Sequence, residues 1–490
     1  KMLMRNIETL TLDQVSDFGV ASLVTRIAND NNNAQQLIVA FFQMILPSPI
    51  MAIISIFLTI QLSPSLALIP LFTILIFAFA IALTLFKSLP YILKVQKKLD
   101  RMVLVLRERF IGAKIIRAFD NSKKERDKFN DIAQDYTDNY ITINKKFALL
   151  SPMAFSLMSV IITLIIFFGA RKVLNNTLEI GSITAIVEYS LTTIAALIMS
   201  SMILVQMPKA VVSIERIEEI LNVTSEIKDK EGLKDNSYYE DILKQNPISL
   251  TFDNVCFRYK GAEKQILKNI SFSIKAGERF AIVGATGSGK STIAKVLLRL
   301  NDIEDGKILI NNYNSLDLPL TCLRNQISYI PQKAYIFSGT IKDNFRFANK
   351  NMTDEEMVKI AKIAQSYDFI DSLPDKFDSF VAQGGTNFSG GQKQRLSIAR
   401  ALSKDSNIYL FDDSFSALDY ATDAKLRKEL KIFLKDKITI IIAQRLNTIA
   451  DADKIIVLKD GEITGMGTHE ELLKNNHEYI ELAKSQGILE

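Results

Sequence analysis

The stretch RFAIVGATGSGKSTIAKVLLRL, residues 279–300, decides the fold of the C-terminal half of this 490-residue chain. It passes from a short apolar run through a glycine-rich loop, residues 284–291, into a helical pattern that begins at Thr292. The loop matches the phosphate-binding pattern G-x-x-x-x-G-K-[ST] in the strand–loop–helix setting that this pattern requires. Glycines let consecutive backbone N–H groups point at a phosphate, and the helix N-terminus adds partial positive charge. The stretch therefore predicts a nucleotide site.

The residue types in this loop suggest individual roles. We expect Lys290 to reach the β and γ phosphates and the Ser291 hydroxyl to ligate Mg²⁺. The alternative is a glycine-rich turn that binds no ligand. The predicted nucleotide-binding residues of the loop are Gly284, Ala285, Thr286, Gly287, Ser288, Gly289, Lys290 and Ser291.

A second motif lies further along the chain, where the apolar run 408–411 ends in Asp412 and Asp413. Asp412 fits the acid that holds Mg²⁺ through water. Alone, this pattern could be an ordinary edge of a parallel sheet. Because it follows a phosphate-binding loop in the sequence, it favours a Mg²⁺-binding role for Asp412. Short β runs alternate with helical patterns from Ile248 onward, which predicts an α/β unit with a mostly parallel sheet. The clearest runs are 248–259, 279–283, 408–411 and 438–443.

The N-terminal half is a different kind of sequence. Residues 31–86 carry no charged side chain, which is enough for two membrane-spanning helices of about 20 residues each. Soluble helices seldom stay uncharged for so long, so a buried soluble core is the weaker interpretation. The segment 87–146 is rich in lysine and arginine, which predicts a cytoplasmic location. The predicted spans are 36–60, 64–86, 147–170 and 183–208.

The composition restricts the class of protein. Hydrophobic residues make up 48% of the chain, which rules out intrinsic disorder. The 59 basic and 54 acidic residues give a net charge of only +5, so nothing favours nucleic-acid binding. Two cysteines are too few for a disulfide scaffold, and two histidines argue against a histidine-rich metal site.

Between the two nucleotide motifs stands Asn387-Phe388-Ser389-Gly390-Gly391-Gln392, which looks like the Leu-Ser-Gly-Gly-Gln signature of ATP-binding cassette (ABC) proteins. Over essentially its whole length the chain resembles the ABC exporters. The resemblance implies an all-α transmembrane domain, with four of six helices present, followed by an α/β P-loop ATPase domain. Because the chain opens at Lys1 rather than at methionine, we expect an N-terminal truncation. The implied parts are a transmembrane domain at 1–221 with cytoplasmic coupling segments at 12–30 and 101–120, a linker at 222–247, and an ATP-binding domain at 248–490.

The resemblance also implies further site residues. Tyr259 stands where the family stacks an aromatic ring on adenine, and Gln332 where it contacts Mg²⁺ and the attacking water. Asp419, in the segment 416–419, belongs to the loop that crosses the interface between two ATPase domains. Gln444 occupies the switch position. In this family two domains sandwich two ATP molecules, so the signature residues Ser389, Gly390, Gly391 and Gln392 would bind the ATP of the partner subunit.

Two catalytic positions depart from the family pattern. Asp413 stands where the family has the glutamate that polarises the attacking water, and Gln444 stands where it has histidine. Aspartate is one methylene shorter than glutamate, and a misplacement of a catalytic group by near 1 Å can cost on the order of 100-fold in rate. Glutamine at the switch position cannot carry a proton or a positive charge. We therefore predict a slow, degenerate site in one subunit of a heterodimer whose partner supplies the full glutamate and histidine. The alternative is that both are tolerated variants in a homodimer.

The sequence thus predicts one half of an exporter that uses ATP and Mg²⁺ to move amphiphilic small molecules, drug-like or lipid-like, across a bacterial plasma membrane. The ATPase domain would be cytoplasmic. A peptide exporter, or a regulatory ATP-binding subunit that gates a partner, are the alternatives. Glu188 is the one ionisable residue within a predicted span, and either a cargo-facing role or a hydrated position near the outer surface fits it.

Overall fold

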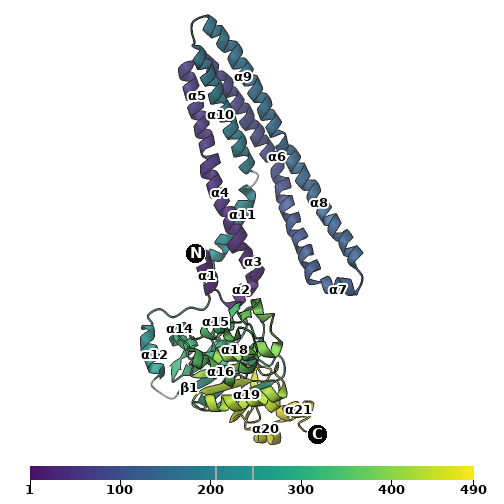
Figure 1. Cartoon of the computed structure of the whole chain (residues 1–490), viewed down its shortest axis with the longest axis vertical. Coiled ribbons are helices and arrows are strands. Elements are labelled where there is room, and N and C mark those ends of the chain that lie inside the picture. Colours follow the sequence, from purple (N-terminus) through teal and green to yellow (C-terminus); the bar gives the residue numbers. More distant parts are fainter. Residues whose placement is uncertain (205–206, 245–247, 490) are drawn as a thin grey trace. The chain divides into compact units, whose positions relative to one another are not determined.

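The structure, a computed structural model, describes residues 1–204, 207–244 and 248–489. The chain divides into two compact units, Lys1–Thr224 and Ser225–Glu490. The first unit is helical, and the second mixes helices with strands, in the order expected (Figure 1). Part of the expected linker, residues 245–247, and residues 205–206 in the expected fourth span lie outside the described residues.

The first unit is built mainly from long helices. α6 (Pro64–Ile111) and α8 (Ser122–Ala148) run side by side and are joined by α7 (Ala113–Ala118), as Figure 1 shows. The expected coupling segment 101–120 covers the end of α6 and all of α7, while 12–30 covers α2, α3 and η1. The remaining elements are α1 (Met2–Thr9), α2 (Leu12–Phe18), α3 (Val20–Thr25), the π-helix η1 (Arg26–Asp30), α4 (Asn31–Ala40), the π-helix η2 (Phe41–Ile45), α5 (Pro47–Leu62), α9 (Leu150–Leu174), α10 (Ile180–Leu204) and α11 (Met207–Asn222).

Four helical segments among the described residues are long and apolar enough to cross a membrane: Val20–Leu62, Pro64–Ile111, Ser122–Leu174 and Ile180–Ser200. The first three contain the spans expected at 36–60, 64–86 and 147–170, and the fourth contains the start of the span expected at 183–208. The helix α6 continues far beyond its apolar run, because charged residues end a hydrophobic stretch without ending a helix. α6 extends to Ile111, through Pro70 and Pro90.

Small polar residues let two of these helices approach closely. One face of α5 is buried against α10, and Ser55 donates a hydrogen bond to the Tyr189 carbonyl at 2.9 Å. Small residues at helix contacts are typical of membrane helix packing, because they bring the backbones together. The buried residues of this α5 face are Ser48, Ala52, Ser55 and Thr59.

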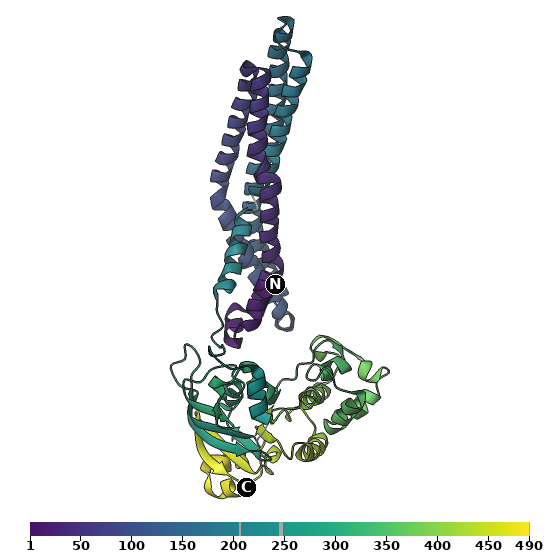
Figure 2. The ribbon, with the colours of Figure 1, turned by 90° about the vertical axis from the view of Figure 1, so that its left-hand side faces the viewer.

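The second unit contains two main sheets and a group of short helices. Figure 2 shows residues around 340–400, in green, as a lobe of short helices beside the sheets. Its strands are β1 (Ser249–Phe257), β2 (Leu267–Lys275), β3 (Arg279–Gly284), β4 (Asp305–Ile310), β5 (Tyr313–Asn314), β6 (Ile327–Ile330), β7 (Gly339–Thr340), β8 (Phe380–Val381), β9 (Ile408–Asp412), β10 (Ile438–Ile442), β11 (Lys454–Lys459) and β12 (Glu462–Gly467). Its α-helices are α12 (Asn236–Lys244), α13 (Lys290–Leu297), α14 (Leu320–Asn325), α15 (Ile341–Arg346), α16 (Asp354–Ile363), α17 (Tyr367–Asp371), α18 (Gly390–Leu402), α19 (Tyr420–Phe433), α20 (His469–Asn475) and α21 (His477–Ser485).

The central sheet has the strand order β12-β11-β3-β10-β9-β6 and is parallel except for β12. Both of its faces are covered, so its central strands are apolar along their whole length, as is usual for parallel sheets. In β3, Phe280 and Ile282 enter one hydrophobic core while Ala281 and Val283 enter the other. The β runs expected near 248–259, 279–283, 408–411 and 438–443 are confirmed as β1, β3, β9 and β10.

The segment expected to be a linker contains structure of its own. α12 packs on the core beneath the antiparallel sheet β2-β1-β4-β5, where Tyr239 and Leu243 are buried. The second unit therefore begins before the first strand, and the described linker residues partly cover the core of this unit.

Candidate functional site

The expected site residues lie at the carboxyl ends of four strands of the central sheet. Parallel strands end together, and ligands bind at the carboxyl ends of such sheets. β3 runs into the loop 284–291, β9 ends at Asp412, β10 leads to Gln444, and β6 leads to Gln332. The register places Ile442 of β10 beside both Ile282 of β3 and Asp412 of β9.

The loop after β3 has a backbone that its sequence makes possible. Gly289 has φ +103° and precedes α13 directly. A Cβ atom on Gly289 would lie 3.0 Å from the Ile266 carbonyl oxygen and 2.9 Å from the Leu267 side chain, so a larger residue does not fit. The loop can therefore turn sharply and present the free N–H groups of the first turn of α13, which is the geometry that binds phosphate.

Lys290 lies folded across this loop. Its ammonium group donates hydrogen bonds to the carbonyl oxygens of Gly284 and Ala285, each at 2.7 Å. Burial lowers the pKa of Lys290, and the negative charges of Asp413 and Asp412 act in the opposite direction. The cation is thus held over the loop at the place where a nucleotide phosphate would enter.

Asp412 is held by two hydroxyl groups. Ser291 donates a hydrogen bond to its Oδ1 at 3.0 Å, and Tyr329 donates one to its Oδ2 at 3.1 Å. Burial raises the pKa of the Tyr329 phenol, and the Asp412 carboxylate raises it further, so the phenol stays protonated. Sequence reasoning missed Tyr329. The signal was its place on the apolar run that leads into Gln332.

Asp413 is held by Gln332, whose side-chain amide donates to Oδ2 of Asp413 at 2.9 Å. The backbone of Asp413 has φ +47°, and its N–H bonds the Ile442 carbonyl at 2.8 Å. Burial raises the pKa of the Asp413 carboxyl and the charge of Asp412 adds to this, while the Gln332 hydrogen bond lowers it. The carboxylate is therefore fixed beside the glutamine rather than free in the cleft.

Gln444 follows β10, and a residue near the C-terminus braces its loop. The Gln486 side chain donates to the Gln444 carbonyl at 2.8 Å and accepts from the Leu446 N–H at 2.9 Å. Gln486 directly follows α21, which is anchored by the fully buried Tyr479. Gln486 was also missed from the sequence, since no motif connects it with Gln444.

Six of the residues described above, Lys290, Ser291, Gln332, Asp412, Asp413 and Gln444, line a cleft of about 380 Å³, a volume in the usual range for ligand sites. Its walls offer hydroxyl groups, a lysine and two carboxylates, and the buried Ser288 hydroxyl has no hydrogen-bond partner among the described residues. The donor set fits the phosphates of a nucleotide, and the oxygens of Ser291, Gln332 and Asp412 fit Mg²⁺, which prefers oxygen ligands. The cleft is lined by Tyr259, Ile266, Thr286, Gly287, Gly289, Lys290, Ser291, Thr292, Gln332, Asp412, Asp413, Ile442 and Gln444.

Tyr259 stands at the side of the cleft. Its ring meets Phe257 edge-on at 4.8 Å between ring centroids, and Lys295 donates a hydrogen bond to its hydroxyl at 3.1 Å. An aromatic ring fixed in this way offers a face on which a planar base can stack. The role of Tyr259 toward adenine stays a prediction.

The signature segment lies elsewhere in the second unit. Ser389 caps the start of α18, because its hydroxyl accepts the Gln392 N–H while its own N–H bonds the Gln392 side chain. A Cβ on Gly391 would lie 3.5 Å from the Ala417 carbonyl oxygen, so this segment adjoins the loop that ends at Asp419. Ser389, Gly390, Gly391, Gln392 and Asp419 are absent from the lining of the cleft. Within one chain the structure therefore does not bring them to the phosphate loop.

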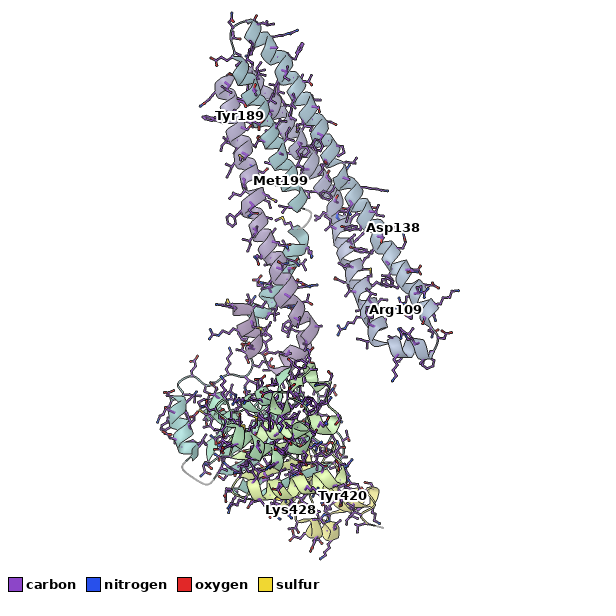
Figure 3. The ribbon with its side chains drawn as sticks, in the orientation of Figure 1. Arg109, Asp138, Tyr189, Met199, Tyr420 and Lys428 are labelled. Atoms are coloured by element: carbon purple, nitrogen blue, oxygen red, sulfur yellow. The ribbon has the colours of Figure 1, made fainter. Side chains whose placement is uncertain are left out.

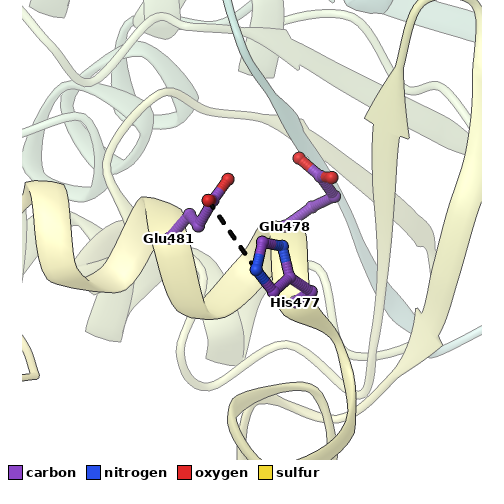
Figure 4. A group of neighbouring side chains, drawn as sticks. All are labelled: His477, Glu478 and Glu481. Atoms are coloured by element: carbon purple, nitrogen blue, oxygen red, sulfur yellow. Dashed lines mark ion pairs between the residues drawn. The ribbon is translucent and has the colours of Figure 1, made fainter.

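The two histidines lie outside the cleft. His469 bonds the Tyr479 hydroxyl at 2.7 Å, a packing role. His477, Glu478 and Glu481 form the one group with metal-site spacing among the described residues (Figure 4). His477 is 80% exposed and lies 3.8 Å from Glu481, and Glu478 is paired with Lys459 at 2.5 Å, so the group lies at the surface and one of its carboxylates already has a lysine partner.

Comparison with known families gives two matches. Residues 1–197 match the family described as ABC transporter transmembrane region, and residues 267–416 match the one described as ABC transporter. The two matched regions follow each other in the order of the two units. The second region includes the phosphate loop, Gln332, the signature segment, and Asp412 and Asp413 at the end of β9.

Similar proteins support the same assignment. An uncharacterized ABC transporter ATP-binding protein of Bacillus subtilis is 33% identical, over 99% of this chain and 83% of the relative. A putative export ATP-binding/permease protein of Rickettsia bellii has the same identity and coverage. An ATP-dependent lipid A-core flippase of Mannheimia succiniciproducens is 31% identical over 80% of this chain and 66% of its own length. Among solved structures, a bacterial Atm1-family ABC exporter with ATP bound superposes with a TM-score of 0.83 at 25% identity, covering 99% of this chain and 83% of that one.

Proposed function

The chain belongs to the ABC transporter family, with the transmembrane region and the ATPase domain fused as in exporters, and from this premise we propose that it is the weakly hydrolytic half of a heterodimeric exporter of amphiphilic molecules. The family assignment makes it a transport ATPase of the bacterial membrane that binds ATP and functions as a dimer. The cargo class, the heterodimer and the slow site are the parts that we propose.

The roles of the site residues follow from their contacts. The loop 284–291 with Lys290 would hold the phosphates of ATP, and Ser291, Gln332 and Asp412 would hold Mg²⁺ between them. When bound, Mg²⁺ neutralises charge on the β and γ phosphates. Gln332 would orient the attacking water together with Asp413, and Gln444 would donate a hydrogen bond to the γ-phosphate.

The observation that carries the slow-site proposal is the hydrogen bond between Gln332 and Asp413 at 2.9 Å. A glutamate carboxylate would reach about one carbon–carbon bond, ~1.5 Å, further into the cleft. Asp413 is shorter and is held by Gln332, so it is badly placed to accept a proton from water at the γ-phosphate. Gln444 cannot compensate, because a glutamine side chain has no titratable group.

An intact signature segment argues for a partner that uses it. Ser389 and Gln392 form a capping box that orders the start of α18, so the loop is preformed for the ATP of a second subunit. Two identical copies would carry two slow sites. A different partner, with a glutamate and a histidine at the corresponding positions, would carry one fast site served by this chain's signature.

The test is transport by the co-expressed pair in inside-out membrane vesicles, with a fluorescent phospholipid and the amphiphilic dye ethidium as probes. We expect ATP-dependent accumulation of at least one probe. The change Lys290→Ala should prevent ATP binding by this chain, whereas Lys428→Ala, at an exposed position of α19 outside the cleft, should retain it. Absence of ATP-driven movement of any amphiphile, with ATP binding preserved, would contradict the export proposal and favour a regulatory subunit.

A further inference from the structure

The helix α10 has one face that no other described helix covers. Its exposed residues recur every three or four positions, which places them in a single stripe along the helix. The opposite face is buried against α5 and α9 and includes Ile186, Ser190 and Ile194. Figure 3 labels Tyr189, next to the middle of the stripe, and Met199, near its cytoplasmic end. The stripe consists of Thr184, Glu188, Thr192, Ala195 and Met199.

The uncovered faces of the other membrane helices have a different composition. They carry large apolar side chains, as a surface in contact with lipid tails requires. Examples are Ile53 and Phe57 of α5, Phe72 and Phe79 of α6, and Phe155 and Phe167 of α9. Among the described residues of α10, only Ile180 at its outer end and Met199 are large, hydrophobic and exposed. The stripe, with two threonines and a carboxylate, is therefore unsuited to lipid.

Glu188 is too deep in the span for hydration at the outer surface. α10 begins at Ile180, so Glu188 lies about 12 Å from the outer end of the helix at 1.5 Å per residue. A glutamate side chain cannot reach across that distance. Within the described part of the chain its carboxylate has neither a hydrogen-bond donor nor an ion-pair partner. The Thr192 hydroxyl, one turn along the helix, donates to the backbone carbonyl of Glu188 at 2.9 Å and not to its side chain.

A carboxylate at this depth needs a water-filled cavity or a positive partner, because an isolated charge in the bilayer is costly. We propose that the α10 stripe lines the cargo path and that Glu188 binds the positive charge of a cationic amphiphile. This rests on the proposed function of the chain as an exporter half and adds the charge of its cargo. Charge complementarity selects the cation, while the apolar remainder of such a cargo suits the neighbouring alanine and methionine.

The experiment compares two ions of the same shape and opposite charge, tetraphenylphosphonium and tetraphenylborate. Their dissociation constants are measured for the full transporter with its partner in lipid nanodiscs, for the parent protein, Glu188→Gln and Glu179→Gln. Glu179 is the matched control, since it is an exposed carboxylate in the connection just before α10. Partitioning into lipid is the same for all three proteins, so the change in the ratio of the two constants reports the side chain.

We expect Glu188→Gln to reduce the preference for the phosphonium ion at least tenfold, while Glu179→Gln leaves it within twofold of the parent. An unchanged ratio in Glu188→Gln, or no phosphonium binding by the parent, would overturn the proposal. Dissociation of the two subunits in Glu188→Gln would assign the carboxylate to the subunit interface and also overturn it. ATP hydrolysis by the same samples separates this inference from the proposed exporter function. If the samples hydrolyse ATP but Glu188→Gln leaves the charge preference unchanged, only the inference about the cargo fails.

Discussion

Gln486 should control the rate of hydrolysis from outside the cleft. Its side chain bonds the backbone on both sides of Arg445, at the Gln444 carbonyl and the Leu446 N–H, and so fixes the loop that positions the switch side chain. The change Gln486→Ala removes both bonds. A net value of about 1 kcal/mol for the half-buried bond to Leu446 and about 0.5 kcal/mol for the exposed bond to Gln444 is reasonable.

The sum, about 1.5 kcal/mol, corresponds to roughly a tenfold change in the equilibrium constant between the ordered and the disordered loop. We therefore expect kcat to fall by a factor of up to about ten, the full factor applying where the loop is ordered only during turnover. The Michaelis constant for ATP should stay within twofold, because the phosphates are bound by the separate loop 284–291. Amide hydrogen exchange of Leu446 should accelerate by a similar factor, which reports loop order independently of turnover.

The assay uses a background in which this chain's own site turns over, Asp413→Glu with Gln444→His. The change Gln486→Glu keeps the acceptor for Leu446 but cannot donate to the Gln444 carbonyl, so its kcat should be intermediate. Lys484→Ala, at the exposed end of α21, is the matched control and should have no effect. The reasoning is refuted if Gln486→Ala turns over at the parent rate, or if Lys484→Ala slows the enzyme equally.

Three further outcomes follow from the structure. Burial raises the pKa of Asp413 above its unfolded value, so the charged form of this side chain destabilises the fold at neutral pH. The change Asp413→Asn should therefore raise the melting temperature at pH 7, and this gain should vanish as the pH falls below about 4, where the carboxyl is protonated in both states. Thermal unfolding measured as a function of pH checks both expectations. Asp412→Asn should raise the Mg²⁺ concentration that half-saturates ATP binding at least tenfold in a titration, whereas a shift under twofold would remove it from the metal site. Gly169→Val should destabilise the α9–α10 contact, since a Cβ there would lie 2.9 Å from Ile183, and an undiminished melting temperature in detergent would contradict that packing.

The arrangement of the candidate site residues was largely predictable from the sequence, because these residues sit in short contiguous motifs whose chemistry depends on local order. The loop 284–291 and Asp412 each follow a buried strand, and parallel strands bring such ends together without further information. Their placement in one cleft follows from the sheet register. The binding roles themselves remain predictions.

Residues that act through tertiary contacts could not be found in this way. Gln486 reaches Gln444 only because α21 packs on the sheet, and Tyr329 meets Asp412 only across two neighbouring strands. The full length of the helices could not be inferred from hydropathy either. The apolar run ends near residue 86, but α6 continues to Ile111. Hydropathy indicates which part of a helix can lie in the membrane, whereas backbone hydrogen bonding determines where the helix ends.

The central claim is that this chain binds ATP at a slow site and depends on an unlike partner. The most direct measurement is the ATPase rate of the purified chain alone and co-expressed with the partner encoded by an adjacent gene, each with and without Asp413→Glu and Gln444→His. The account predicts a nearly silent lone chain, an active pair, and a rate that rises with the double change. Brisk hydrolysis by the unaltered lone chain would contradict it and would make the protein a homodimeric exporter in which Asp413 and Gln444 suffice.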